Sequence, residues 1–206
     1  MPLTIRSVPH PLLEAGAFVA RLHQALTQIP SPRPDAPAPL TGSDTVKTAV
    51  RDLLRHGGFK PSGRSKPASE YLASAFADGR WPQINALVDA CNVVSLHAGL
   101  PISLVDLDKV TGALAIEVAP PGTSYVFNPS GQVIDASGLV CLCDEQGPTG
   151  TPVKDAQRTK TDADTKNVLV IVWGTNALPG RTDETTRWYR ALLTPYAVIE
   201  DVAIDT

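Results

Sequence analysis

The chain has 206 residues, of which 43% are hydrophobic, and a formal net charge of −3. This length can bury a substantial core, and the slight acidity argues against a dedicated nucleic-acid binder while leaving room for a local basic patch. Three cysteines exclude a disulfide framework, and no apolar run reaches the roughly 18 residues that span a bilayer. The N-terminus has no apolar signal core. We expect a cytoplasmic protein with no membrane partner.

The first elements are predicted to be a strand at 3–8 and a helix at 12–27. The helix rests on apolar residues near helical spacing: Leu13, Phe18, Leu22 and Leu26. The run IPSPRPDAPAPL at 29–40 contains five prolines, which exclude helix and central strand. We expect a surface linker within one domain, since the 28 preceding residues are too few for a core of their own.

Two amphipathic helices are expected next. Ser43 or Asp44 can cap the first, which runs to about His56 and ends at a Gly-Gly pair. After a loop at 59–67, the segment 65–76 supplies a second, short helix.

The stretch at 81–108 is predicted to form a helix, a turn and a strand on which neighbouring segments pack. Pro82 is tolerated in the first helical turn, and Gly99 and Pro101 end the helix before a buried strand at 102–106.

A polar stripe lies beside the apolar face of this helix, formed by Asn85, Asp89 and Asn92 at i, i+4 and i+7. Buried Asp and Asn side chains need hydrogen-bond partners. We therefore predict that Asp89 and Asn92 are structural.

The rest of the chain reads mostly as strands, expected at 113–118, 124–127, 139–143 and 168–173. The last of these is a continuous apolar run, typical of a central strand covered on both faces. Thr182 is expected to cap a final helix through about residue 193. Helices followed mainly by strands predict an α+β (mixed α/β) fold in which helices cover a mixed sheet.

Positive charge concentrates around the loop at 59–67, in a basic cluster of Arg51, Arg55, Lys60, Arg64 and Lys66. One interpretation is contact with phosphate or the RNA backbone. The alternative is a solvated helix end, where cations oppose the helix dipole, and the residues by themselves favour it.

A polar segment before the apolar run at 168–173 contains Lys154, Asp155, Arg158, Thr159 and Thr165. A loop that leads into a central strand is a common place for a site, and hydroxyls with one carboxylate suit a polar small molecule. A loop that uses its threonines as backbone caps explains the pattern equally well.

Two further pairs have a structural explanation that we favour. Asp106 and Asp108 could hold Mg²⁺, but such a pair more often caps a turn. Cys141 and Cys143 share one side of a strand, which is weak evidence for zinc and fits small buried side chains. We expect no metal and no cofactor.

No catalytic motif is present: GxSxG, HExxH, Walker A and the Rossmann fingerprint are all absent. None of the four histidines belongs to an evident triad. The residues thus favour a binding pocket over a catalytic apparatus, and the catalytic residues are unknown.

Three stretches together resemble the B3/B4 domain of the phenylalanyl-tRNA synthetase β subunit, and more closely its free-standing relatives. They are KPSGRSKPASEYL at 60–72, INALVDACNVVSLHAGLPISLVDLDKVTG at 84–112 and KDAQRTKTDADTKNVLVIVW at 154–173, with the strand GLVCLCDEQG at 138–147 between the last two. The resemblance covers about 45–175. It implies a mixed α/β globule and an editing site that hydrolyses a wrongly esterified amino acid from tRNA.

The resemblance implies some site residues and departs from the family at others. Ser103 stands where the synthetase has a His, and Asp155 or Gln157 stands near a family Glu. In the implied mechanism a water attacks the ester carbonyl, and a ribose hydroxyl and backbone N–H groups stabilise the oxyanion.

We therefore predict an aminoacyl-tRNA deacylase that acts in trans, with tRNA as its partner and an amino-acid moiety as its ligand. The substrate pocket is predicted to comprise Ser103, Asp155, Gln157, Thr159 and Thr165, and the basic cluster is predicted to carry any RNA contact. The alternatives are a non-catalytic RNA- or protein-binding module and an amino-acid-binding protein.

Overall fold

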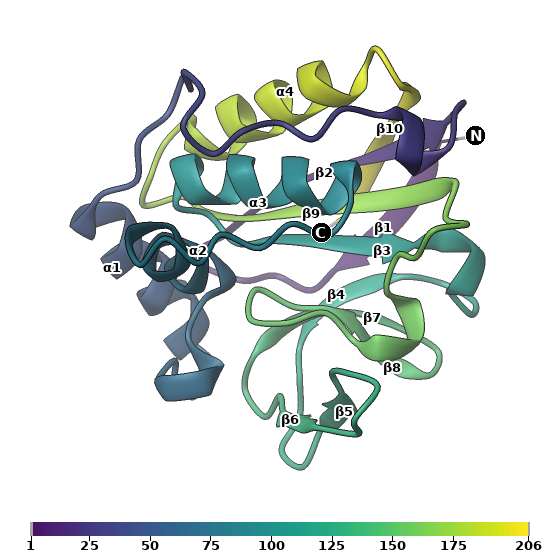
Figure 1. The fold of residues 1–206 in the computed structure, drawn as a ribbon. Helices are drawn as coiled ribbons and strands as arrows, with labels where there is room; N and C mark the ends of the chain where they lie inside the picture. Colours follow the sequence, from purple (N-terminus) through teal and green to yellow (C-terminus); the bar gives the residue numbers. More distant parts are fainter. Residues whose placement is uncertain (1, 206) are drawn as a thin grey trace.

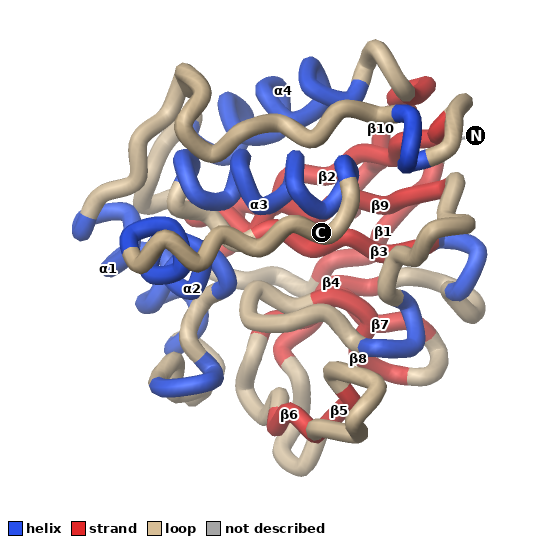
Figure 2. Tube along the Cα trace, viewed as in Figure 1, coloured by secondary structure: helices blue, strands red, loops and turns tan. Residues whose placement is uncertain are grey.

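The computed structural model describes residues 2–205 and is built on one large, curved β-sheet (Figures 1 and 2). Its eight strands lie in the order β3 (Ile102–Asp106), β9 (Asn167–Thr175), β2 (Leu13–Leu22), β10 (Ala197–Asp205), β1 (Leu3–Ser7), β4 (Ala115–Val118), β7 (Val140–Asp144) and β8 (Gly147–Gly150). β1 pairs in parallel with β10 and β4, and the other pairs are antiparallel. The predicted mixed sheet is confirmed.

Four α-helices accompany the sheet: α1 (Asp44–Arg55), α2 (Ala68–Ala77), α3 (Ala86–Ala98) and α4 (Arg181–Leu193). In Figure 1, α3 and α4 lie side by side on one face of the sheet, α4 against β2 and β9 and α3 against β3, while α2 packs against α3. A small separate hairpin pairs β5 (Ser124–Val126) with β6 (Val133–Asp135). The α+β class is therefore confirmed. Within residues 2–205, no helix combines the length and apolarity needed to cross a membrane.

The sheet curls until its two edge strands, β3 and β8, come into contact. One apolar cluster lies on its concave face, and its members include Ile5, Ile116, Leu142, Ile171 and Trp173. A second cluster lies between the opposite face and the helices. Side chains of β9 alternate between the two clusters, which explains its uninterrupted apolar sequence and confirms the central strand.

The helix predicted at 12–27 is wrong, because β2 occupies this segment between β9 and β10. Phe18, Ala20 and Leu22 face the helices, whereas Val19 faces the concave side. A spacing of four residues, as between Phe18 and Leu22, satisfies a period of two as well as a helical period. Neighbouring strands decided between them, and Gly16 permits close packing because a Cβ there would lie 2.2 Å from Thr186 Oγ1 of α4.

Helix α3 begins four residues after the predicted Pro82 start. Asn85 is its N-cap, and the Asn85 side chain accepts a hydrogen bond from the Val88 N–H at 3.0 Å. The preceding segment is extended, and Ile84 is 65% exposed. The predicted end is correct, since Gly99 takes a positive φ of 68° and closes the helix.

The C-terminal region differs from prediction in two ways. Helix α4 has Gly180 as N-cap, and the buried Thr182 hydroxyl donates instead to Glu14 Oε2 at 2.9 Å. β10 was not expected at all. It lies between β2 and β1, and Glu200 and Asp201 interrupt the β-branched residues of its half-buried sequence, which are Val198, Ile199, Val202 and Ile204.

Asp89 is buried and joins three segments. Its Oδ1 accepts the Ile84 N–H at 2.9 Å, and its Oδ2 accepts the Ser31 hydroxyl of the Pro-rich segment at 2.6 Å. The Pro-rich segment at 29–40, called the strap below, therefore packs across α3. A second contact holds it there, since Pro34 O lies 2.9 Å from His97 Nε2. These contacts support the structural role predicted for Asp89.

Asp89→Ala is expected to lower the free energy of unfolding by about 1–3 kcal/mol, because two donors would lose a buried acceptor. Urea denaturation followed by circular dichroism measures this. Asp35→Ala is the matched control, since this exposed carboxylate of the same strap pairs only with Arg33 and its loss should leave the midpoint unchanged. A midpoint for Asp89→Ala equal to that of wild type would contradict the assignment.

Candidate functional site

Ser103 and Asp155 meet where the sheet closes. The Ser103 hydroxyl donates to Thr151 O at 3.1 Å and accepts the Trp173 indole N–H at 2.8 Å. The Asp155 carboxyl group accepts the Leu104 N–H at 3.1 Å and the Thr151 N–H at 3.2 Å. These bonds fasten the free edge of β3 to the chain that follows β8. Their role in a substrate pocket stays a prediction.

The other predicted pocket residues are more scattered. The buried Thr159 hydroxyl donates to Thr149 O of β8 at 3.3 Å, and Gln157 begins the same short 3-10 helix. The Thr165 hydroxyl donates to Asp106 Oδ2 at 2.7 Å, at the end of β3 remote from Ser103. Thr165 lines a cavity of about 400 Å³ with His23 and Asp164, and neither Ser103 nor Asp155 borders it. The structure thus groups Ser103 with Asp155 but separates Thr165 from them.

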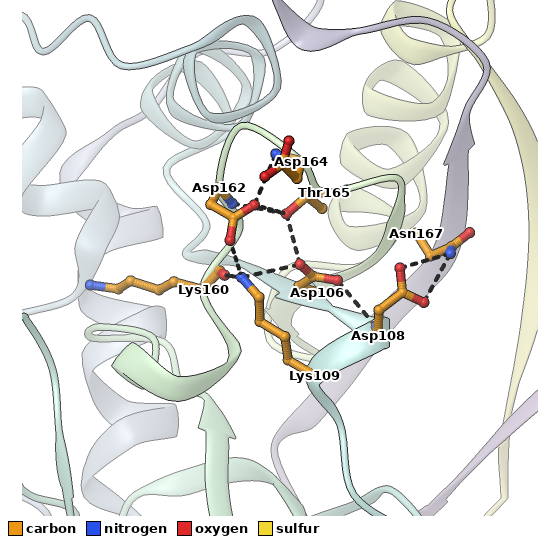
Figure 3. A network of polar contacts seen from close by, with 8 residues as sticks. All are labelled: Asp106, Asp108, Lys109, Lys160, Asp162, Asp164, Thr165 and Asn167. Atoms are coloured by element: carbon orange, nitrogen blue, oxygen red, sulfur yellow. Dashed lines mark hydrogen bonds and ion pairs between the residues drawn. The ribbon is translucent and has the colours of Figure 1, made fainter.

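An acidic network surrounds Thr165 (Figure 3). The Lys109 ammonium donates to Asp162 Oδ2 and to Lys160 O, both at 2.6 Å, and lies 3.2 Å from Asp106 Oδ2. Asp106 also accepts the Asp108 N–H at 3.1 Å. The turn explanation therefore holds for Asp106, which caps the 3-10 turn Leu107–Lys109, whereas the Asp108 carboxylate accepts the Asn167 side-chain N–H at 3.0 Å. Within residues 2–205 no group of three acidic, His or Cys side chains could hold a metal ion.

All three cysteines are buried and free, as expected for small core side chains. Burial raises the pKa of the Cys143 thiol to about 12, with nearby Glu117 adding to the effect. A thiol of this kind stays protonated at neutral pH and is a poor nucleophile.

The pKa of Asp155 is raised to about 6 by burial. The neighbouring Ser103 hydroxyl, the two backbone N–H groups and the charge of Lys160 act in the opposite direction and lower this pKa. Asp155 therefore changes protonation near physiological pH inside the closure of the sheet.

A cavity of about 510 Å³ lies between α2, α3 and the chain beyond β8. Its lining residues are cationic, aromatic or aliphatic, apart from Asn92 and small backbone positions, and the cations are Arg64, Lys66 and Lys154. No acidic side chain lines it. Two other cavities have similar volumes, about 520 and 570 Å³, but both are bordered by carboxylates, among them Asp44. The first cavity is the candidate site because its charge is of one sign.

Two lysine side chains lie against the ring of Phe127, which lines this cavity. The Lys154 and Lys160 ammonium groups lie 4.4 and 3.8 Å from the centroid of its ring, and Lys160 also donates to Phe127 O at 2.6 Å. Burial lowers the pKa of Lys154, and the charge of Arg64 lowers it further. Figure 3 shows the Lys160 side chain extending away from the acidic network.

The predicted basic cluster divides into two groups. Arg51 forms a two-pronged ion pair with Glu70 at 2.6 and 2.7 Å, and Arg55 pairs with Asp52 at 3.0 Å. Lys60 is exposed, whereas Arg64 and Lys66 line the cavity. Sequence reasoning did not join Lys154 and Lys160 to this cluster because they lie about 90 residues away. In the sequence they are only two lysines of the polar segment before the apolar run at 168–173.

The difference in unfolding free energy between wild type and Asp155→Asn should change between about pH 4 and 6. The pKa of Asp155 is about 6 in the folded state against 3.8 in a model compound, so the unfolded chain loses its proton first as pH rises. Wild type should therefore lose about 2–3 kcal/mol relative to the variant across this window and no more above it.

Urea titrations at several pH values measure this difference. An Asp35→Asn control, altered at an exposed carboxylate, should parallel wild type through the window. A pH-independent difference for Asp155→Asn would show that Asp155 does not titrate there.

The chain matches known proteins over most of its length. The family model described as the B3/4 domain covers residues 62–193, which begins and ends later than the segment 45–175 expected from the motifs. The phenylalanine–tRNA ligase β subunit of Bordetella pertussis is 30% identical over 172 residues, which cover 79% of this chain and 21% of that protein. The Ralstonia nicotianae subunit gives the same values. The chain thus spans about a fifth of the length of these curated relatives.

The fold has a solved counterpart. An N-terminal fragment of the phenylalanyl-tRNA synthetase β subunit from Pyrococcus horikoshii superposes with a TM-score of 0.51 and 11% identity, covering 98% of this chain and 52% of the fragment. At that identity the likeness concerns the fold alone. The sequence match and the shared fold agree with the motifs, and the chain belongs to the B3/4 domain family.

Proposed function

We propose that this domain binds the 3′ end of an aminoacylated tRNA and hydrolyses the ester that joins the amino acid to it. The observation that carries the proposal is the cavity between α2 and α3, whose charged side chains are all cationic in a chain of net charge −3. A local basic surface is what a slightly acidic protein needs to bind a polyanion. The names of the curated relatives, which are tRNA ligase subunits, support the same class of partner.

The proposed chemistry asks little of side chains. The aminoacyl group would lie near the closure of the sheet, where Asp155 directly follows the cavity residue Lys154. A water attacks the ester carbonyl, and backbone N–H groups with the neighbouring ribose hydroxyl stabilise the developing oxyanion. Asp155 already accepts two N–H bonds, so its role in this proposal is to position the chain from 151 to 155.

A non-catalytic tRNA-binding module is the second candidate. It is favoured by one observation: no His, Cys, Ser, Asp or Glu lines the cavity. A module of this kind would bind tRNA without releasing its amino acid.

A panel of mischarged tRNAs tests the function. We expect faster release of the amino acid from at least one member than in buffer alone, with multiple turnovers per protein. Binding without release across the panel would support the binding module instead. Thermal stabilisation by a free amino acid, with no effect of tRNA, would indicate an amino-acid-binding protein.

The double variant Arg64→Ala/Lys66→Ala should weaken tRNA binding and flatten the slope of log K against log salt by about one unit per lost phosphate contact. The matched control is Arg33→Ala/Arg55→Ala, which removes the same charge from exposed arginines paired with Asp35 and Asp52. Filter binding across a salt series measures both. Equal slopes for the two double variants would show that Arg64 and Lys66, and with them the cavity, do not contact the RNA.

A further inference from the structure

A second cavity lies against a different face of α2, between the first turns of α1 and the last turn of α3, and has a volume of about 520 Å³. It shares no lining residue with the cavity proposed for tRNA. Unlike that cavity, it is lined by charges of both signs, which belong to Asp44, Lys47 and Glu70. This mixture of charges indicates a different class of ligand.

The buried carboxylate in the lining already has its partner. Glu70, whose side chain is 10% exposed, accepts both prongs of the Arg51 guanidinium at 2.6 and 2.7 Å. The Lys47 ammonium lies 4.0 Å from the same carboxylate and is 49% exposed. One carboxylate therefore faces two cations, and Arg51 holds the closer position. Lys47 can accordingly pair with a second anion that enters the cavity.

The opposite charge comes from Asp44, three residues before Lys47 on α1. Neighbours at this spacing have Cβ atoms roughly 5–6 Å apart. The two nevertheless form no ion pair, and Asp44 takes part in none among residues 2–205. The last turn of α3, which carries the negative end of a helix dipole, borders the same cavity through Leu96 and His97. Asp44 and this helix end favour an ammonium group.

His97 adds an acceptor to the same wall. Its Nε2 lies 2.9 Å from Pro34 O, and a carbonyl oxygen only accepts, so Nε2 carries the proton of the neutral ring. Nδ1 is then an acceptor and can take an N–H from a ligand.

The remaining wall is apolar and is formed by Ala73, Phe76 and Leu96. The Phe76 side chain is 42% exposed, and its ring meets that of Trp81 edge to face at 5.9 Å. The volume lies within the range of roughly 300–1,000 Å³ typical of ligand pockets. A ligand that satisfies the whole lining carries an ammonium, a carboxylate and an apolar group.

We propose that this cavity binds a free α-amino acid with an apolar side chain. Its ammonium group pairs with Asp44, its carboxylate pairs with Lys47, and its side chain packs on Phe76. In an α-amino acid a single carbon separates the two charged groups, which suits two side chains that are neighbours on one helix. An aminoacyl ester has no free carboxylate for Lys47. The inference therefore concerns the free amino acid and does not rest on the proposed function.

Isothermal titration calorimetry of the full chain with L-leucine and with L-phenylalanine tests this site. We expect L-leucinamide, which lacks the carboxylate, and N-acetyl-L-leucine, which lacks the ammonium group, to bind roughly 10-fold or more weakly than L-leucine, as for a lost hydrogen bond to a charged group. Asp44→Asn and Lys47→Met should each weaken L-leucine binding by a similar factor. The analogues probe the same contacts on the wild-type chain, so the test does not depend on how the variants fold.

Matched controls come from nearby exposed residues. Asp52→Asn alters a carboxylate of α1 that pairs with Arg55 and lines a neighbouring cavity to which Asp44 also contributes. Lys60→Met alters an exposed lysine that lines neither cavity. Both controls should bind L-leucine as wild type does. A loss in Asp52→Asn equal to that in Asp44→Asn would move the ligand to the neighbouring cavity and overturn the inference.

The remaining outcomes separate this inference from the proposed function. No heat of binding for either amino acid at millimolar concentrations, or equal binding of L-leucinamide, would overturn the site. Leucine binding that is lost in Arg64→Ala/Lys66→Ala but kept in Lys47→Met would place the amino acid in the tRNA cavity and also overturn it. Leucine binding that needs Asp44 and Lys47, without deacylation of any tRNA, would support the site and overturn only the enzyme.

Discussion

The structure depends on the closure of its curved sheet. An edge strand presents unpaired N–H groups that need acceptors when they are buried. The Asp155 carboxyl group accepts the Leu104 N–H from β3 and the Thr151 N–H beyond β8, so one side chain holds both edges. Burial raises the pKa of this carboxyl group, and the two hydrogen bonds offset part of that effect. Among residues 2–205 no buried side-chain nitrogen or oxygen lacks a hydrogen-bond partner, which shows how completely the interior is satisfied.

Hydrogen-bond partners within the chain distinguish structural polar groups from candidate functional ones. Asp89, Asp106 and Ser103 all have partners within the chain, and their contacts explain why they are there. The lysines at 154 and 160 have a ring and a carbonyl oxygen beside them but no carboxylate in an ion pair. A surface that binds an anion can be recognised by cations that form no ion pair within the fold. In this chain such charge gathers where the segment after β8 faces α2 and α3.

The agreement between prediction and structure follows the range of each physical signal. Caps, glycine stops and apolar periodicity act within a few residues, so the ends of α1, the end of α3 and the course of β9 were predicted well. The helix prediction for 12–27 was wrong because the apolar spacing fits both a helical period and a period of two. Only the pairing with β9 and β10 selects the strand. Strand β10 was not predicted because two acidic residues interrupt its β-branched sequence, and its pairing with β1 and β2 is visible only in the folded chain.

The sequence by itself determined the family, the mixed fold and the local elements, because ordered motifs and short-range periodicity survive without tertiary contacts. It also placed Ser103 and Asp155 among the residues of interest. Only the tertiary structure decided which cations form ion pairs within the chain and which do not. Arg51 and Arg64 look alike in the sequence, yet Arg51 pairs with Glu70 whereas Arg64 joins Lys154 from a segment 90 residues away. Charge compensation is set by distances in space, and a linear chain records none of them until it folds.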